Sequence, residues 1–367
     1  MRPVPYAEKK MKVIVDDKIP YIREAIERIA DEVVYVPGKE FTPELVHDAD
    51  ALIIRTRTRC DQALLEGSRV RFIATATIGF DHIDTEYCRQ AGITWTNAPG
   101  CNARSVQQYI ESVLILLKQE EGMKLSELTI GVVGVGHVGT LVVELAEAYG
   151  MKVLRCDPPR ALAEGDLPLA LAEKGDGLPY FHSLSELMEL CDLISFHVPL
   201  IREGAYPSYH LADDSFFAGL KKKPFIINTS RGEVVETAAI KRALDKGLIR
   251  NAVLDVWENE PHIDLELLNR IFIGTPHIAG YSADGKANAT RMSLDALCHF
   301  FGIEASYQIK TPLPEHTEIH ADADEATLLI YDPRRDCRAL RLHPEDFERL
   351  RGNYPLRRER EAYTIIC

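Results

Sequence analysis

The sequence predicts an α/β protein in which a doubly wound parallel sheet is inserted into a smaller α/β domain. Three observations lead to this prediction. Short apolar segments of β type alternate with helical patterns through most of the chain. A glycine-rich turn at residues 134–139 joins one such strand to a helix, and charged residues follow later strands where each one ends. Strands that alternate with helices in this way form parallel sheets.

The composition excludes several classes of protein. The chain has 367 residues, enough for two or three domains, and is 46% hydrophobic and 27% charged, as is ordinary for a globular protein. Its net charge of −13 disfavours binding to nucleic acid or to an anionic membrane. The first ten residues lack the apolar stretch of a secretory signal. Eight cysteines lie singly, without the spacing of a metal site, which predicts reduced thiols, a cytoplasmic location and no metal.

The N-terminal part, residues 11–117 after a short extension over 1–10, is predicted to be a flavodoxin-like α/β domain. A helix over 20–30 begins with a proline, which suits the first helical turn. Ser105 and Gln108 resemble a capping box that opens a long helix over 106–118. The predicted strands are 12–15, 51–54, 72–76 and 93–95.

The glycine run Gly134-Val135-Gly136-His137-Val138-Gly139 is the most informative motif. A strand pattern over 128–133 precedes it, and a helical pattern over 140–149 follows. In a dinucleotide-binding fingerprint the first glycine makes the tight turn, the second lets the pyrophosphate approach, and the third lets helix and strand pack closely. A glycine-rich turn that binds nothing is the alternative, but the surrounding strand–turn–helix–strand pattern favours a dinucleotide.

Asp157 indicates which dinucleotide binds. It ends the next strand pattern, 151–156, 18 residues after Gly139. A carboxylate there accepts the hydroxyls of the adenine ribose and repels the 2′-phosphate of NADP. Arg155 and Arg160 lie nearby and argue the other way, but Asp157 stands at the strand tip. The sequence therefore predicts a Rossmann-type domain, residues 118–281, that binds NAD.

Two further segments complete the predicted organisation. A helical pattern over 282–302 returns to the N-terminal domain. Residues 303–367 form a third unit with a strand over 327–331, a helix over 344–350 and a strand over 362–366. This unit is small for independent folding, so it is predicted to be an α+β dimerisation domain of a homodimer.

Arg231, Glu260 and His277 each follow a predicted buried strand of the nucleotide domain. Ligands bind outside the carboxyl ends of parallel strands, so the three side chains are expected to share one cleft. Oxidation of a 2-hydroxy acid needs a base for the hydroxyl proton, for which histidine is suited, and a cation for the carboxylate. Each residue alone is more often structural, but their joint occurrence favours an active site.

These motifs resemble the D-isomer-specific 2-hydroxyacid dehydrogenase family. The match runs through the glycine run, Asp157, Asn228-Thr229-Ser230-Arg231-Gly232, Asp255, Glu260 and His277. Further motifs, among them 75–82, 98–103 and 331–336, resemble the branch that oxidises 4-phospho-D-erythronate in pyridoxal-phosphate biosynthesis.

The resemblance implies a role for each matching position. His277 would be the acid and base, Glu260 its partner, and Arg231 the residue that grips the substrate. Cofactor contacts are implied for Gly134, Gly136, His137, Val138, Gly139, Asp157, Val198, Thr229, Ser230, Arg231, Asp255 and Gly280, and substrate contacts for Thr56, Thr77 and Tyr281. Val198 stands where the family usually has threonine, so this chain lacks a hydroxyl there.

A phosphorylated substrate requires local positive charge in this acidic protein. Arg55, Arg57 and Arg59 alternate around Thr56, and an extended segment would place all three on one side. A charged strand edge that prevents aggregation is the alternative. The resemblance favours phosphate binding by Arg57 and Arg59. Other functions that remain open are a 3-phosphoglycerate or other 2-hydroxyacid dehydrogenase and an NAD-sensing scaffold without catalysis.

Overall fold

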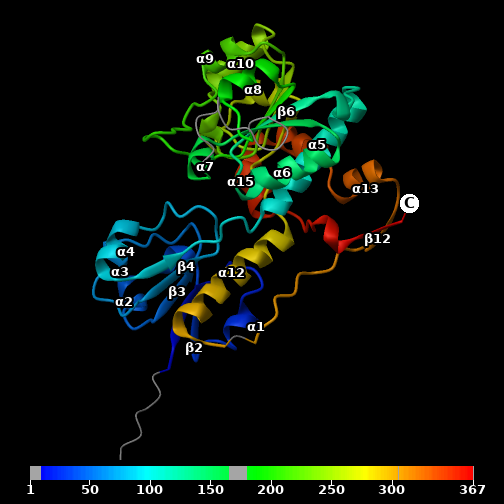
Figure 1. Cartoon of the computed structure of the whole chain (residues 1–367). Coiled ribbons are helices and arrows are strands. Elements are labelled where there is room, and N and C mark those ends of the chain that lie inside the picture. The colour runs from blue at the N-terminus through cyan, green and yellow to red at the C-terminus, as the bar shows by residue number, and fades with distance from the viewer. Residues whose placement is uncertain (1–9, 165–179, 305, 367) are drawn as a thin grey trace, which may run out of the picture. The chain divides into compact units, whose positions relative to one another are not determined.

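The computed structural model describes residues 10–164, 180–304 and 306–366, which form two compact units. The first unit comprises residues up to 102 together with 282–313, and the second comprises 103–281 together with 314–367. Figure 1 shows the helices and strands of both units along the chain. Within the described part of the chain, no helix is long and apolar enough to cross a membrane.

The first unit is built on a parallel sheet with the strand order β2-β1-β3-β4-β5, which is the flavodoxin-like order. Its strands are β1 (Lys12–Asp16), β2 (Glu32–Val36), β3 (Ala51–Ile54), β4 (Phe72–Thr75) and β5 (Thr94–Thr96). Its helices are α1 (Arg23–Ile26), η1 (Gly38–Glu40), α2 (Pro43–Val46), α3 (Gln62–Leu65), α4 (Thr85–Ala91) and α12 (Ala283–Phe301). The predicted flavodoxin-like domain is confirmed.

The two faces of this sheet have separate apolar cores. Val13 and Val15 pack in one cluster with Leu294 and Leu297 of α12. Ile14, between those two valines, packs in the other cluster. Because side chains alternate along a strand, β1 supplies both cores and is buried on both sides. This explains the continuous apolar pattern of the strand in the sequence.

The second unit contains a six-stranded sheet in the order β11-β10-β9-β8-β6-β7, with every neighbouring pair parallel. Its strands are β6 (Thr129–Val133), β7 (Lys152–Cys156), β8 (Leu193–Phe196), β9 (Phe225–Asn228), β10 (Asn251–Leu254) and β11 (Ile273–Gly274). The strand order reverses between β6 and β8, and ligands of doubly wound sheets bind at this point. The predicted Rossmann-type sheet is confirmed.

The helices of this unit cover its sheet, and α5 and α6 pack against each other (Figure 1). They are α5 (Ala103–Glu120), η2 (Leu125–Glu127), α6 (His137–Ala148), α7 (Pro158–Ala163), α8 (Leu184–Leu190), α9 (Asp214–Gly219), η3 (Gly232–Val234), α10 (Thr237–Asp245) and α11 (Leu265–Arg270).

The C-terminal segment packs on this same unit. Leu340 and Phe347 share a core cluster with Trp257, and Tyr331 and Cys337 join the other core cluster of the unit. Its elements are β12 (Glu318–His320), α13 (Ala323–Ile330), α14 (Pro333–Leu342), η4 (Pro344–Asp346), α15 (Phe347–Gly352), η5 (Arg360–Ala362) and β13 (Thr364–Ile366), and β12 pairs with β13. The segment thus shares its cores with the nucleotide domain.

Three local predictions are wrong. The strand expected over 327–331 is helical, because Asp322 caps α13 by accepting a 2.9 Å hydrogen bond from the Glu325 amide. The helix expected over 20–30 is reduced to α1, since Tyr21 has a φ of 63° that breaks helical geometry before it. Ser105 does not cap α5, which begins two residues earlier.

Candidate active site

The glycine run forms the turn between β6 and α6 as the fingerprint requires. Gly134 has a φ of +86°, and a Cβ there would lie 2.6 Å from the His197 carbonyl oxygen. A Cβ on Gly139 would lie 1.9 Å from the Gly134 oxygen, whereas Gly136 faces open space. The first and third glycines are therefore needed for the turn and its packing, and the second leaves room for a ligand to approach the backbone.

The N-terminus of α6 is available to an anionic ligand. Gly136 is its N-cap, and no side chain of the described residues caps this helix end. His137 is exposed and Val138 is half-buried in the first turn. Backbone N–H groups at such an end attract a pyrophosphate, so these residues fit the NAD contacts that the sequence implies.

Asp157 stands at the end of β7, as predicted, and its carboxylate connects this strand end to the glycine turn and to the start of α7. Its Oδ2 accepts a 2.8 Å hydrogen bond from the Val135 amide, and its Oδ1 accepts one of 3.0 Å from the Arg160 amide at the start of α7. Asp157 is half-buried. The carboxylate therefore fixes the glycine turn and caps α7, in a place where an adenine ribose would meet it.

The ends of β8 and β9 are joined by a histidine. His197 Nε2 lies 2.8 Å from Ser195 Oγ, and its Nδ1 lies 3.3 Å from Thr229 Oγ1. Desolvation lowers the pKa of His197 to about 3, so the ring is neutral at physiological pH. Val198 and Ser230, both predicted cofactor contacts, lie on these same two loops. The ring holds the two loops together at the point where the strand order reverses.

The predicted acid–base pair is present. His277 Nδ1 lies 2.8 Å from Glu260 Oε2, and Glu260 Oε1 accepts a 3.0 Å hydrogen bond from the Trp257 amide. Burial raises the pKa of Glu260, but the hydrogen bond and charge of His277, the Trp257 amide and Arg351 outweigh it and lower the pKa overall. Glu260 is thus held as a carboxylate that orients the imidazole.

Arg231 lines the same pocket as Glu260 and His277. The pocket holds about 330 Å³ and is also lined by Arg202, Tyr209, Gly232, Glu233, Trp257, Glu258 and Asn259. Arg231 Nη1 donates a 2.7 Å hydrogen bond to the Ser230 carbonyl, which directs the guanidinium from the end of β9. The three residues that the sequence grouped by strand position therefore lie together, with a cation, a base and a carboxylate beside one cavity.

The loop that carries His277 is held from behind by Asp255, which is 1% exposed. Its Oδ1 accepts hydrogen bonds from Thr275 Oγ1 (2.7 Å) and the Ile278 amide (2.8 Å), and its Oδ2 accepts one from the Ala279 amide (2.9 Å). His277 itself has a φ of 56°, a conformation that a non-glycine residue adopts at a cost. Asp255 is therefore a positioning residue for this loop, whatever contact it makes with the cofactor.

Comparison with known proteins agrees with this geometry. Residues 103–279 match the family described as D-isomer specific 2-hydroxyacid dehydrogenase, NAD binding domain, and residues 310–367 match a domain of unknown function (DUF3410). The chain is 63% identical over 357 residues to a Bacteroides fragilis protein named erythronate-4-phosphate dehydrogenase, covering 97% of this chain and 99% of the relative.

The chain belongs to the erythronate-4-phosphate dehydrogenase family. A Porphyromonas gingivalis relative of the same name is 44% identical over 365 residues, covering 97% of this chain and 95% of the relative. The sequence-based assignment to the 2-hydroxyacid dehydrogenases is confirmed. The protein is an NAD-dependent oxidoreductase.

Solved structures of related dehydrogenases share the fold. A 3-phosphoglycerate dehydrogenase of Entamoeba histolytica with bound NAD⁺ has a TM-score of 0.63 and 26% identity, and covers 83% of this chain and 99% of its own. A D-lactate dehydrogenase from Aquifex aeolicus, complexed with NAD and lactic acid, has a TM-score of 0.61 and 26% identity, and covers 79% and 95%. The prediction of NAD as cofactor is confirmed.

In this dehydrogenase the substrate residues predicted on the first unit lie at the carboxyl edge of its sheet. Thr77 Oγ1 donates a 2.8 Å hydrogen bond to the Gly79 carbonyl, and Thr56 is exposed after β3. The expectation of an extended segment with three arginines on one side is wrong, because a hydrogen bond from the Thr58 amide to the Arg55 carbonyl (3.2 Å) closes a turn.

The arginines of this turn have different surroundings. Arg55 Nη1 donates a 3.2 Å hydrogen bond to the Lys18 carbonyl. Arg59 Nε donates one of 2.9 Å to Asp61, and its side chain is 82% exposed. Arg57 is exposed. The turn therefore presents Arg57 and Arg59 to solvent and anchors Arg55 to a neighbouring loop.

Sequence reasoning missed several charged residues near the catalytic pair. His210 Nε2 lies 2.7 Å from Glu258 Oε1, and Arg202 lies over the Tyr209 ring at 4.3 Å in the same pocket. Arg351 of α15 lies 3.7 Å from Glu260. His210 and Arg202 follow β8, as other ligand-binding residues do, whereas Arg351 comes from a segment with no recognised motif.

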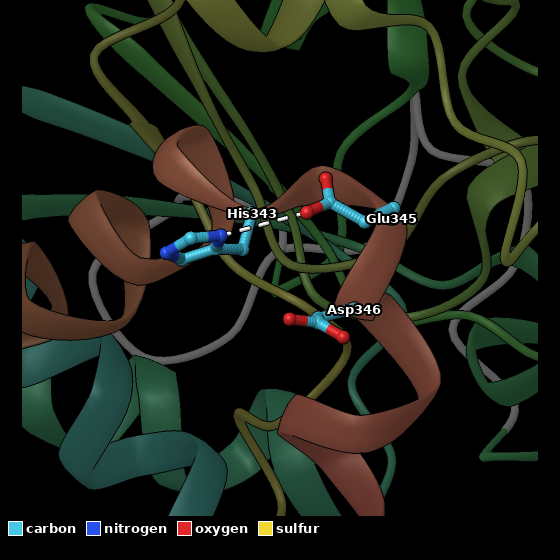
Figure 2. A group of neighbouring side chains, drawn as sticks. All are labelled: His343, Glu345 and Asp346. Carbon is cyan, nitrogen blue, oxygen red and sulfur yellow. Dashed lines mark ion pairs between the residues drawn. The ribbon is translucent and has the colours of Figure 1, made fainter.

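His343, Glu345 and Asp346 lie close together between α14 and α15 (Figure 2). His343 Nδ1 lies 3.5 Å from Glu345, and Asp346 forms an ion pair with Arg349. The hydrogen bond from Arg349 lowers the pKa of Asp346. His343 and Glu345 are exposed and Asp346 is half-buried, so the group has the character of surface ion pairs.

Proposed function

We propose that this protein oxidises 4-phospho-D-erythronate to (R)-3-hydroxy-2-oxo-4-phosphooxybutanoate with NAD, a step of pyridoxal 5′-phosphate biosynthesis. The observation that carries the proposal is the His277–Glu260 pair, 2.8 Å apart, beside Arg231 in one pocket. The name of the relatives at 63% and 44% identity supports the choice of substrate.

Three residues of the pocket, His277, Glu260 and Arg231, each have a chemical task. Nδ1 of His277 is occupied by Glu260, so Nε2 is the nitrogen that takes the proton of the substrate hydroxyl. Glu260 stabilises the imidazolium that forms, because its carboxylate stays ionised. The guanidinium of Arg231 binds the substrate carboxylate and the developing carbonyl. The glycine turn and Asp157 would hold NAD, which would supply the hydride acceptor.

The substrate phosphate requires a cationic site in a protein whose net charge is −13. Arg57 and Arg59, exposed in the turn after β3, are the residues we assign to it. Thr56, Thr77 and Tyr281 would complete the contacts with the substrate. The turn geometry supports two arginines rather than three for this role, since Arg55 binds the Lys18 carbonyl.

We propose further that the protein is a cytoplasmic homodimer formed through its C-terminal segment. Four large apolar side chains of this segment are exposed, namely Leu329, Leu342, Leu356 and Ile366. A symmetric partner could cover them. All seven described cysteines are buried and unpaired, which suits a reducing compartment. Light scattering should give the mass of a dimer, and a monomeric mass would contradict the proposal.

Steady-state assays on three acids test the proposed substrate. The value of kcat/KM should be highest for 4-phosphoerythronate, lower for 3-phosphoglycerate and lowest for unphosphorylated erythronate. A preference for 3-phosphoglycerate would favour the second candidate, to which the structural likeness with the Entamoeba enzyme points. NAD binding without NADH formation from any 2-hydroxy acid would favour a non-catalytic NAD sensor.

A further inference from the structure

We propose that residues 351–357, in the domain of unknown function, position the catalytic His277–Glu260 pair of the same subunit. The inference rests on the proposed function only because kcat of the proposed reaction is the quantity that its tests measure. Three side chains of this segment, Arg351, Tyr354 and Arg357, contact different parts of the site.

Arg357 holds the backbone of the His277 loop. It is 6% exposed, and its Nη1 and Nη2 donate hydrogen bonds to the carbonyls of Ile278 (3.3 Å) and Ala279 (3.0 Å). Asp255 accepts hydrogen bonds from the amides of these same two residues. The Asp255 carboxylate therefore binds the amides, and the Arg357 guanidinium the carbonyls, of the two residues directly after His277. This clamp holds the loop in the left-handed conformation of His277.

The guanidinium of Arg357 is itself fixed. Its Nε donates a 2.9 Å hydrogen bond to Gln108 Oε1 on α5, and it lies 3.9 Å from the centre of the Tyr331 ring. Ser105, on the same helix, donates a 2.9 Å hydrogen bond to Glu359. The two polar residues that resembled a capping box are thus anchors for the C-terminal segment. These two buried residues of α5 therefore hold the C-terminal segment in place.

Arg351 acts on the other member of the pair. Its Nη1 lies 3.7 Å from Glu260 Oε2, the oxygen that contacts His277, and the two side chains are 22% and 18% exposed. Glu348 lies 3.5 Å from the same nitrogen. Within the described residues, Nε of Arg351 is buried without a hydrogen-bond partner. The charge of Arg351 therefore helps to keep Glu260, the partner of His277, ionised.

Tyr354 provides the third contact. Its ring packs edge-on against Tyr281 with 5.9 Å between centroids, and its hydroxyl donates a 2.8 Å hydrogen bond to Asp336 of α14. Tyr281 ends the loop that begins at Thr275, and it is a predicted substrate contact. The C-terminal segment consequently supports the catalytic loop at its middle and at its end, as well as the carboxylate partner of His277.

The first test replaces Arg351 by methionine, which removes the charge and keeps much of the length. The charged groups that line the pocket around the pair are Arg202, Arg231, Glu233 and Glu258, and none of them is changed. We expect kcat to fall on the order of 10-fold through lost positioning, with the NAD dissociation constant unchanged.

Two further variants make this result specific. Arg351→Lys keeps the charge and should restore most of kcat. Arg349→Met removes the same charge from the same helix, where the side chain is 62% exposed and pairs with Asp346, and should leave kcat as in the wild type. Wild-type kcat in Arg351→Met, or an equal loss in Arg349→Met, would overturn the positioning role of Arg351.

The second test replaces Arg357 by lysine, which keeps one donor and the charge but loses the two-carbonyl clamp. We expect kcat to fall by about 10²-fold, since displacement of a catalytic group by about 1 Å has an effect of that size. NAD binding and the melting temperature report whether the variant folds. If Arg357→Lys fails to fold, Ser105→Ala and Gln108→Leu, which loosen the anchors from α5, are the replacements. Folded variants with wild-type kcat would overturn the clamp.

The failure of this inference and the failure of the proposed function give different results. Histidine-labelled NMR of the NAD complex follows the His277 imidazole without any substrate. The chemical shifts of that signal should change in Arg351→Met and stay in place in Arg349→Met even if 4-phosphoerythronate is not the substrate. An unchanged signal in Arg351→Met would reject the inference, whereas a changed signal without turnover would reject only the proposed substrate.

Discussion

Nδ1 of His277 lies 2.8 Å from Oε2 of Glu260, and in the proposed mechanism this contact decides which imidazole nitrogen takes the substrate proton. The carboxylate occupies Nδ1, so Nε2 remains for the substrate. Because Glu260 also accepts the Trp257 amide and keeps a lowered pKa, it is an oriented anion and not a neutral acid. The reaction then requires a neutral imidazole for oxidation, with a carboxylate that stabilises the charged ring afterwards.

Replacement of Glu260 by glutamine tests this electrostatic role. The amide keeps the size of the side chain but provides no charge, so the imidazolium loses its stabilising partner. We expect kcat to fall by about 10²-fold or more, within the range for acid–base catalysis. A kcat close to the wild-type value would mean that Glu260 only holds the ring by a hydrogen bond.

Replacement of Asp157 by serine separates its two structural tasks from cofactor choice. Serine can still cap α7, as Asp157 does through the Arg160 amide. It removes the charge that repels a 2′-phosphate and the acceptor for the ribose hydroxyls. The ratio of kcat/KM for NAD over NADP should fall by about 10-fold or more, since a charge-assisted hydrogen bond contributes about 1.5–3 kcal/mol. An unchanged ratio would assign cofactor choice to another residue.

His197 gives the protein a predictable pH dependence of stability. Its pKa is lowered from an ordinary value of 6.5 to about 3. Between these two pH values the histidine is protonated in the unfolded chain but stays neutral in the folded protein. The stabilisation from the neutral ring is therefore complete above pH 6.5 and is lost as the pH falls. His197→Asn should reduce the slope of the unfolding free energy against pH between these two values. The reduction should correspond to the uptake of about one proton fewer on unfolding. Urea unfolding at several pH values measures it, and an unchanged slope would contradict the assignment.

Arg57 is the position where the turn after β3 should contact the substrate phosphate. Arg57→Ala should raise KM for 4-phosphoerythronate by about 10-fold or more, the equivalent of one charge-assisted contact. Arg59→Ala should also raise KM for 4-phosphoerythronate, because the Arg59 side chain is 82% exposed in the same turn. Any weak activity on unphosphorylated erythronate should stay nearly unchanged. Equal losses on both substrates would show that the turn serves the carboxylate or the fold.

The sequence was sufficient for the parts of the fold and site that depend on local patterns. The predicted strands of both sheets, the glycine turn and Asp157 lie where periodicity and spacing placed them, although β2 and β11 were not predicted. Arg231, Glu260 and His277 could be grouped because each follows a buried strand, and the carboxyl ends of parallel strands meet at one edge. These inferences need only the alternation of strands and helices along the chain.

The rest depends on contacts between distant segments. The apolar run at 327–331 is compatible with either a strand or a buried helix, and only the N-cap Asp322, which accepts a hydrogen bond from the Glu325 amide, favours the helix. Ser105 bonds to Glu359, more than 250 residues away, so its similarity to a cap was misleading. Arg351 could not be placed near Glu260 from the sequence either, because the distance of 3.7 Å between them exists only after the C-terminal segment has packed.

The measurement that tests the account most directly is NADH formation from 4-phosphoerythronate by the wild type and by His277→Asn, with NAD affinity determined for both. The wild type should turn over this substrate, and the variant should lose about 10²- to 10⁴-fold in kcat while its NAD affinity stays the same, because the glycine turn and Asp157 hold the cofactor. Wild-type kcat in His277→Asn would contradict the account, since the proton would then have another acceptor.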